Sequence, residues 1–261
     1  MNPAHPTPTA LRHAYNDQIR TRMVVHDPKT ETVEQSGPLW RKLSRAGTGL
    51  IAYRDLDGFD GPDLDALIAA QRDRFARQGG AVEWKYHDYD RPADLPQRLS
   101  SAGFVPGEPE ALVLGEAADV AIANRLPAGV TLRRITGRED LERLRDLQNI
   151  VWGTDHDWLP DALTAELGSD TDPIIVVVAE ADGDLVCGSW IRFHKGTDFA
   201  SLWGGSTLPQ WRGRGIYRAA VARRAQFALA QGFRYLQVDS SPNSRPILES
   251  LGLSTVAMTT P

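Results

Sequence analysis

The sequence predicts an α/β fold, in the α+β sense, built from two similar domains that each hold a mixed, mostly antiparallel sheet flanked by helices. Three observations lead to this prediction. The chain has 261 residues, which is long for one globular domain and sufficient for two at roughly 150 residues each. Segments with strand-like and helix-like periodicity follow one another along the chain. Finally, one order of long helix, strand and short helix occurs in both halves.

The repeat is clearest in two helical segments with related sequences, Ala70-Gln-Arg-Asp-Arg-Phe-Ala76 and Ala222-Arg-Arg-Ala-Gln-Phe-Ala228. Each is followed by a glycine, a strand and a short helix that ends at Gly103 or Gly252. The shared order favours an internal duplication over a chance similarity. We expect residues 1–10 to form a flexible tail, residues 11–120 the first domain and residues 128–261 the second.

Composition narrows the class of protein. The hydrophobic content of 41% and charged content of 24% are ordinary for a soluble globular chain. The net charge of −5 argues against a general nucleic-acid binder. The single cysteine, Cys187, lies in an apolar run, so we expect a small buried side chain and a reducing compartment. With no signal-peptide pattern and no run of about 18 apolar residues, we expect a cytoplasmic monomer or homodimer without membrane contact.

The first half shows alternating helix and strand patterns. Helices are expected at residues 11–23, 63–78 and 93–102. Two strands are expected within residues 39–53, turning at residues 45–49, and further strands at residues 81–86 and 111–115. The second helix follows the turn Gly58-Phe-Asp-Gly-Pro62 and ends at Gly79-Gly80.

The second half begins with a strand at residues 130–135 and two helices, at residues 140–152 and 161–167. Three consecutive antiparallel strands are then expected at residues 174–180, 185–194 and 199–203, because turn residues separate them. A long helix at residues 218–231, a strand at 233–239, a short helix at 244–251 and a strand at 253–258 complete the pattern.

A glycine-rich turn separates the third of these strands from the long helix. Its sequence is Ser206-Thr-Leu-Pro-Gln-Trp-Arg-Gly-Arg-Gly-Ile-Tyr217. Backbone N–H groups at a helix start form an anion site when glycines let a ligand approach closely. Such turns also occur simply as helix caps, but the preceding strand and the two arginines favour a phosphate ligand.

The second half resembles the GNAT acetyltransferase superfamily in the order of its elements and in this turn. Gln210-x-x-Gly213-x-Gly215 fits the Q/R-x-x-G-x-G/A signature of that family, and Thr207-Leu-Pro209 precedes it. The resemblance implies that the N–H groups of residues 212–217 hold the pyrophosphate of acetyl-CoA and that the strand edge at residues 206–208 pairs with the pantetheine arm. The cofactor-binding candidates are Ser206, Thr207, Leu208, Gln210, Arg212, Gly213, Arg214, Gly215, Ile216, Tyr217, Ser241, Asn243 and Ser244.

The resemblance also implies direct attack of a small amine on the acetyl carbonyl, with no metal. A base must take the proton of the amine. The candidates are Asp155, His156, Asp157, His194 and Asp198, and the family's habit of placing the base on the strand before the turn favours Asp198. Three tryptophans are expected to line the amine pocket or to pack in the core: Trp152, Trp158 and Trp203.

Three departures from the family pattern matter. The place of its usual tyrosine acid falls on Leu248, which cannot donate a proton, so a non-catalytic acyl-CoA-binding or regulatory module is the alternative function. The turn of the first domain carries Asp55, Asp57 and Asp60, whose charges repel phosphate, so that domain is expected to be a degenerate copy. The chain also ends one strand short of the family's seven, so the missing strand is either truncated or contributed by the other domain.

Overall fold

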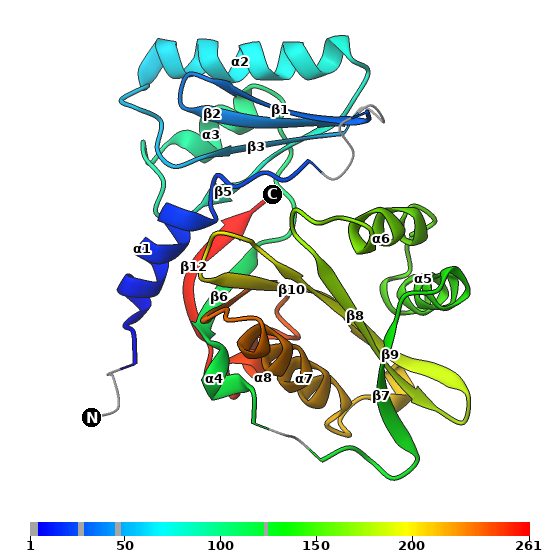
Figure 1. The fold of residues 1–261 in the computed structure, drawn as a ribbon. Helices are drawn as coiled ribbons and strands as arrows, with labels where there is room; N and C mark the ends of the chain where they lie inside the picture. Colours follow the sequence, from blue (N-terminus) through cyan, green and yellow to red (C-terminus); the bar gives the residue numbers. More distant parts are fainter. Residues whose placement is uncertain (1–4, 26–28, 45–47, 123–124) are drawn as a thin grey trace. The chain divides into compact units, whose positions relative to one another are not determined.

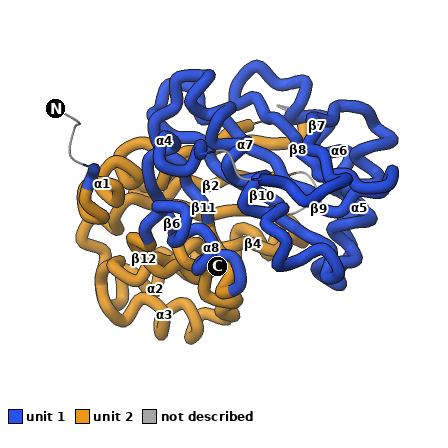
Figure 2. The backbone as a smooth tube through the Cα atoms, turned by 90° about the horizontal axis from the view of Figure 1, so that it is seen from below, with its two compact units in different colours: residues 1–6, 113–238, 243–254 blue, residues 7–112, 239–242, 255–261 orange. Residues whose placement is uncertain are grey.

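The computed structural model describes residues 5–25, 29–44, 48–122 and 125–261 (Figure 1). The chain divides into two compact units, coloured in Figure 2. Unit 1 consists of residues 1–6, 113–238 and 243–254, and unit 2 of residues 7–112, 239–242 and 255–261.

Unit 2 contains a four-stranded sheet of β1 (Glu31–Ser36), β2 (Leu39–Ser44), β3 (Gly49–Tyr53) and β4 (Val82–Trp84), in that order. β1 to β3 form an antiparallel meander, and β4 lies parallel to β3. The helices of the unit are α1 (Pro8–Gln18), α2 (Gly61–Arg77) and α3 (Leu95–Ser101). Apolar residues of α2, α3 and the sheet, among them Leu64, Ile68 and Leu95, make its core.

The same unit also contains β5 (Tyr86–His87), which pairs antiparallel with β12 (Ser254–Thr260). The strand on the other side of β12 is β6 (Glu110–Glu116), and residues 110–112 of β6 belong to unit 2.

Unit 1 has the strand order β6-β11-β10-β9-β8-β7. These strands are β7 (Val130–Ile135), β8 (Ile174–Ala181), β9 (Asp184–Phe193), β10 (Phe199–Thr207) and β11 (Tyr235–Ser240), with residues 113–116 of β6. The helices are α4 (Ala117–Val120), α5 (Arg138–Trp152), α6 (Leu159–Leu167), α7 (Ile216–Ala230) and α8 (Arg245–Glu249).

Both faces of this sheet are covered, which explains the continuous apolar run of β8. Val176 and Val178 pack with α5 and α6 in one cluster, whereas Ala179 and Ala181 pack with α7 in another. Because side chains alternate along a strand, these clusters lie on opposite faces. Figure 1 shows α7 and the α5–α6 pair as separate elements of the unit.

The internal repeat is visible in the topology. In each half an antiparallel meander leads through a turn into a long helix and then into a strand parallel to the last strand of the meander. The final strand of each repeat belongs in part to the unit that holds most of the other repeat. Residues 113–116 of β6 belong to unit 1, and residues 255–260 of β12 belong to unit 2.

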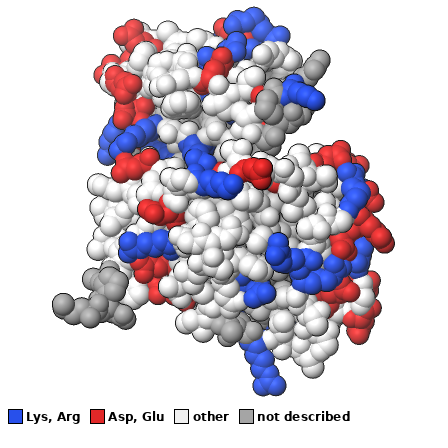
Figure 3. Space-filling view, viewed as in Figure 1, with Lys and Arg blue, Asp and Glu red and all other residues white. Residues whose placement is uncertain are grey.

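The predicted fold class is confirmed, and most predicted elements are present within a few residues of their predicted bounds. The missed elements include β1, which carries few apolar residues, and the short helix α4. Part of the turn predicted at residues 45–49 lies outside the described residues. No helix in the described ranges has the length and apolar character needed to cross a bilayer. On the face drawn in Figure 3, acidic and basic side chains are interspersed.

Candidate functional site

The candidate site of unit 1 begins where β10 and β11 part. Their parallel pairing is confined to the segment in which residues 199–201 of β10 lie opposite residues 235–237 of β11. On its other side β10 stays paired with β9 as far as Thr207, with a register shift between Trp203 and Ser206. The later part of β10 therefore has one strand neighbour in its described pairing, next to the predicted pantetheine edge at residues 206–208.

Two glycines make the register shift possible. Gly204 has a φ of +61°, and a Cβ at this position would lie 1.8 Å from a ring carbon of Trp190. A Cβ on Gly205 would lie 2.6 Å from Cε2 of Tyr217. Aromatic rings from β9 and from α7 thus press on neighbouring residues of the bulge.

Gln148 of α5 fastens the bulge on the α5–α6 side. Its Nε2 donates to the carbonyl of Gly204 at 2.8 Å, and its Oε1 accepts from Ser206 Oγ at 2.8 Å. Trp152 Nε1 donates to the same Gln148 oxygen and to Ser206 Oγ, each at 2.8 Å. The side chain of Ser206 is therefore structural, whereas its backbone forms part of the strand edge.

Arg224 of α7 fastens the bulge on the opposite side. It is 1% exposed, and Nη1 donates to the carbonyls of Trp190 and Trp203 at 3.1 and 3.2 Å. These are the residues that pair just before the register shift. Burial lowers the pKa of Arg224, and its electrostatic partners are Tyr217 and Cys187.

Both Gln148 and Arg224 were missed from the sequence. Each lies on the apolar stripe of its helix, Gln148 four residues after Leu144 and Arg224 three after Val221. A polar residue at a core position was the signal that identifies them.

The glycine turn leads directly into α7. Gly213 has a φ of +72° with open space where a Cβ would point, and Gly215, at +82°, is the N-cap. Because this N-cap is a glycine, it has no side chain that could accept from the first amides of α7. Ile216 is buried and anchors the helix, whereas Gln210 is exposed on a short 3₁₀ turn.

Two exposed arginines flank this helix start. Arg212 Nε donates to the carbonyl of Thr207 at 3.0 Å, and the Arg214 guanidinium lies 4.8 Å from the centre of the Trp211 ring. Neither has a carboxylate partner within the described part of the chain. A helix N-terminus capped by glycine, a glycine cradle and two available cations together fit a pyrophosphate group.

The residues after β11 divide between the units. Ser241 lies in unit 2, whereas Asn243 and Ser244 lie in unit 1. Ser244 stands at the N-cap of α8 without capping it by its side chain. Leu248, the residue expected from the sequence at the place of a tyrosine acid, is fully buried.

The candidate bases lie in different settings. Asp155 accepts from the backbone N of Asp157 at 2.7 Å within an exposed turn. His156 Nδ1 lies 3.0 Å from Asn149 Oδ1. Asp198 is exposed ahead of β10, and its carbonyl accepts from the backbone N–H groups of Arg234 and Tyr235.

His194 belongs to a buried polar chain. Its Nδ1 lies 3.0 Å from Asp172 Oδ2, and its Nε2 lies 2.8 Å from Ser201 Oγ. The same oxygen accepts from Trp203 Nε1 at 2.6 Å. These hydrogen bonds hold the indole of Trp203, which remains 40% exposed beside the bulge. The Arg192 guanidinium lies 4.9 Å from the centre of this ring.

Trp152 and Trp158 are also exposed, whereas Cys187 is buried as expected, which raises the pKa of its thiol.

The corresponding turn of unit 2 differs in charge. Asp57 has a φ of +49°, and its backbone N donates to Asp55 Oδ1 at 2.9 Å. These two residues and Asp60 line a cavity of about 530 Å³, together with the buried pair Arg20–Asp90. The turn carries carboxylates where the turn of unit 1 carries arginines.

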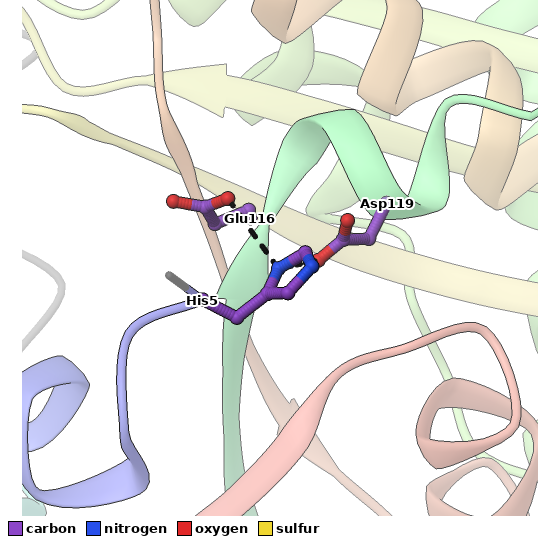
Figure 4. A group of neighbouring side chains, drawn as sticks. All are labelled: His5, Glu116 and Asp119. Atoms are coloured by element: carbon purple, nitrogen blue, oxygen red, sulfur yellow. Dashed lines mark ion pairs between the residues drawn. The ribbon is translucent and has the colours of Figure 1, made fainter. Parts of the chain in front are cut away.

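One group of metal-ligand type occurs among the described residues, formed by His5, Glu116 and Asp119 (Figure 4). His5 Nδ1 lies 3.3 Å from Asp119 Oδ2. Arg234 donates two hydrogen bonds to the Glu116 carboxylate, at 2.9 and 2.6 Å. Its positive charge therefore offsets the negative charge of Glu116 that would attract a metal ion.

Comparison with known proteins identifies the domain. Residues 140–252 match the sequence model of the Acetyltransferase (GNAT) family. A GCN5-related N-acetyltransferase from Kribbella flavida has a similar structure, with a TM-score of 0.71 and 18% identity over 96% of this chain and 93% of that one. No curated protein sequence matches the chain.

Two further structures share the fold across both halves. A tandem GNAT protein from the clavulanic acid biosynthesis pathway has a TM-score of 0.64 and 13% identity over 90% of this chain and 84% of that one. A GCN5-related N-acetyltransferase from Sphaerobacter thermophilus has a TM-score of 0.62 and 15% identity, over 85% and 75%. At these identities the likeness concerns the fold.

Proposed function

Because residues 140–252 form a GNAT acetyltransferase domain, we propose that the chain is an acetyl-CoA-dependent N-acetyltransferase that transfers the acetyl group to a small amine by direct attack. We assign the working site to the second domain, residues 128–261. The first domain, residues 11–120, is a degenerate copy that does not bind acyl-CoA.

One observation carries the proposal. The start of α7, with its glycine N-cap, glycine cradle and two available arginines, directly follows the part of β10 that has left β11. A pyrophosphate at the helix start places the attached arm along that strand edge, with its reactive end toward the bulge at Gly204 and Gly205. Acetyl-CoA supplies an activated acyl group there.

The residues around the bulge suit an amine acceptor. Trp152 and Trp203 are exposed at its two ends, and an aromatic face attracts a cation. The exposed carboxylates Asp155 and Asp157 add negative potential. Backbone N–H groups of the bulge are the donors for the acetyl oxygen, and the base belongs to the group His194, Asp198, Asp155, His156 and Asp157.

A specific observation favours the alternative of a non-catalytic acyl-CoA-binding module. Leu248 is buried where the family places its acid, so that position offers no proton to the departing thiolate. A measurement of turnover distinguishes a binding module from an enzyme.

The first experiment measures release of free thiol from acetyl-CoA across a panel of amines, peptides and aminoglycosides, and the affinity for CoA by calorimetry. Turnover with at least one acceptor supports the enzyme. Tight CoA binding without any turnover supports the binding module, and no binding at high micromolar CoA refutes both.

The cradle is tested by Gly213→Asp, since open space and tolerance of aspartate for positive φ allow the side chain. Repulsion amounts to about 1–3 kcal/mol for each phosphate charge about 5 Å away, so CoA affinity falls about tenfold to a hundredfold for one such charge. Gly196→Asp, at another open positive-φ turn, and Asp57→Ala are the controls that keep affinity.

A further inference from the structure

The cavity of unit 2 has the size of a small-molecule pocket. Its volume is about 530 Å³, within the range in which proteins bind small ligands. Every residue that lines it belongs to unit 2. The lining comes from α1 and the residue Arg20 just after it, from the turn between β3 and α2, and from the segment after β5. It includes five aspartates and three arginines, which leaves an excess of negative charge.

Arg20 is the buried cation of this lining, with 6% of its surface exposed. Its guanidinium carbon lies 5.1 Å from the ring centres of both Tyr53 and Tyr89. A guanidinium has five N–H groups, but among the described residues Arg20 makes one hydrogen bond, from Nη2 to Asp90 Oδ1. Its Nε is buried without a partner. The buried end of the cavity therefore holds N–H donors that lack an acceptor.

Asp90 is already occupied by other donors. Its Oδ2 accepts from the Tyr53 hydroxyl at 2.5 Å and from the backbone N of His87 at 2.9 Å. The charges of Arg20 and Asp90 compensate each other. An oxygen that enters the cavity consequently needs no negative charge of its own to accept a hydrogen bond from Arg20.

The exposed end of the cavity carries carboxylates instead. Asp17 is paired with Arg54. Three further aspartates of the lining are exposed and form no ion pair with Lys or Arg among the described residues, namely Asp55, Asp57 and Asp60. Asp60 stands at the N-cap of α2, yet its side chain makes no capping hydrogen bond. This end of the cavity therefore favours a cation.

The cation that fits is organic. The group of metal-ligand type in the described part of the chain lies in unit 1, at His5, and does not include these aspartates. A primary ammonium group carries three N–H donors that several carboxylates can share.

We propose that this cavity is a second binding site and that it takes a small hydroxylated primary amine, such as an amino sugar. The ammonium group donates to the carboxylates of the acidic turn, and a hydroxyl oxygen accepts from the free N–H groups of Arg20. The three carboxylates that repel a phosphate thus attract the ammonium group. The proposal concerns binding alone, so it does not depend on acetyl transfer by the second domain.

The first test compares three probes on the full chain by calorimetry, at a mildly acidic pH that keeps the amines charged. D-glucosamine carries both an ammonium group and hydroxyl groups, D-glucose lacks the ammonium group, and cyclohexylamine lacks the hydroxyl groups. Because each missing group loses a hydrogen bond, glucosamine should bind about three- to tenfold more tightly than either relative. Equal affinities, or no binding of glucosamine at millimolar concentration, overturn the proposal.

The second test locates the bound amine with the double variant Asp57→Asn, Asp60→Asn. Asparagine tolerates the positive φ of residue 57, and no capping bond is lost at residue 60. Loss of two exposed charges should weaken glucosamine binding about threefold to tenfold. Asp73→Asn, exposed on α2 outside the lining, is the matched control that keeps the affinity.

An unchanged affinity in the double variant overturns the proposal. A loss that occurs only in Asp155→Asn does so as well, because it assigns the amine to the second domain. Since no acetyl-CoA is present in these measurements, such a failure leaves the proposed acetyl transfer untouched.

Arg20→Lys tests the buried end of the cavity. Lysine keeps a positive charge for Asp90 but lacks the planar set of N–H groups. The preference for glucosamine over cyclohexylamine should fall to about one, and an unchanged preference overturns the role of Arg20. If this variant does not fold, the wild-type preference and the double variant decide the proposal, because both leave Arg20 in place.

Discussion

Replacing Gly204 by alanine tests whether the bulge of β10 depends on the absence of a side chain. The residue has a φ of +61°, and the added Cβ would lie 1.8, 2.4 and 2.5 Å from three carbons of the Trp190 ring. Adopting the left-handed conformation costs about 1–2 kcal/mol for a residue with a Cβ. Displacing a packed core ring costs about 1–3 kcal/mol more.

Gly196→Ala is the matched control. Gly196 also has a positive φ, +78°, but nothing lies within 4 Å of its Cβ direction. The Gly196→Ala variant has the same conformational cost and the same effect on the unfolded chain, but its added Cβ collides with no neighbouring side chain. The difference between the two variants therefore isolates the steric effect, expected at about 1–3 kcal/mol.

Urea unfolding monitored by tryptophan fluorescence measures this difference from the transition midpoints at a common slope. Equal destabilisation of Gly204→Ala and Gly196→Ala would refute the close packing of Trp190 against the bulge.

Two further predictions concern buried polar groups. Burial, with Arg20 and Lys85 adding to it, lowers the pKa of His87 from 6.5 to about 2, so the folded state keeps it neutral while the unfolded chain binds a proton below about pH 6.5. Stability should fall by about 1.4 kcal/mol per pH unit below that point. His87→Gln should reduce this slope, and equal slopes for the wild type and the variant in urea unfolding at several pH values would contradict the prediction. Ser201→Ala removes the buried hydroxyl that hydrogen-bonds both His194 Nε2 and Trp203 Nε1, and it should destabilise unit 1 by about 1–3 kcal/mol. Ser189→Ala loses one 3.2 Å hydrogen bond to a carbonyl, so it should lower the free energy of unfolding by less and leave the fluorescence of Trp203 unchanged. A larger destabilisation by Ser189→Ala than by Ser201→Ala would contradict the prediction.

The fold was largely predictable because its determinants are local. The β-branched run of β8, the turn at residues 182–184 and the glycine stops of the helices each specify an element without reference to distant residues. The strand β1, with the sequence Glu-Thr-Val-Glu-Gln-Ser, was not predictable because its pairing with β2 overrides a weak propensity.

The candidate site was predictable only in part. The glycine turn carries its signal in the sequence, whereas the fastening of the bulge depends on Gln148 and Arg224, which meet it from two different helices. The relation of Asp172 to His194 is likewise a contact between distant residues. No spacing in the sequence shows that these side chains meet.

The divided membership of the final strands has a consequence for the order in which the protein is made. Unit 2 contains nearly all of the N-terminal half, but it also contains residues 255–261, which follow unit 1 in the chain. During synthesis the N-terminal half leaves the ribosome first, and its sheet of β1 to β4 and its core need no residue of the second half. The pairing of β5 with β12, in contrast, forms only after the ribosome has translated the second half.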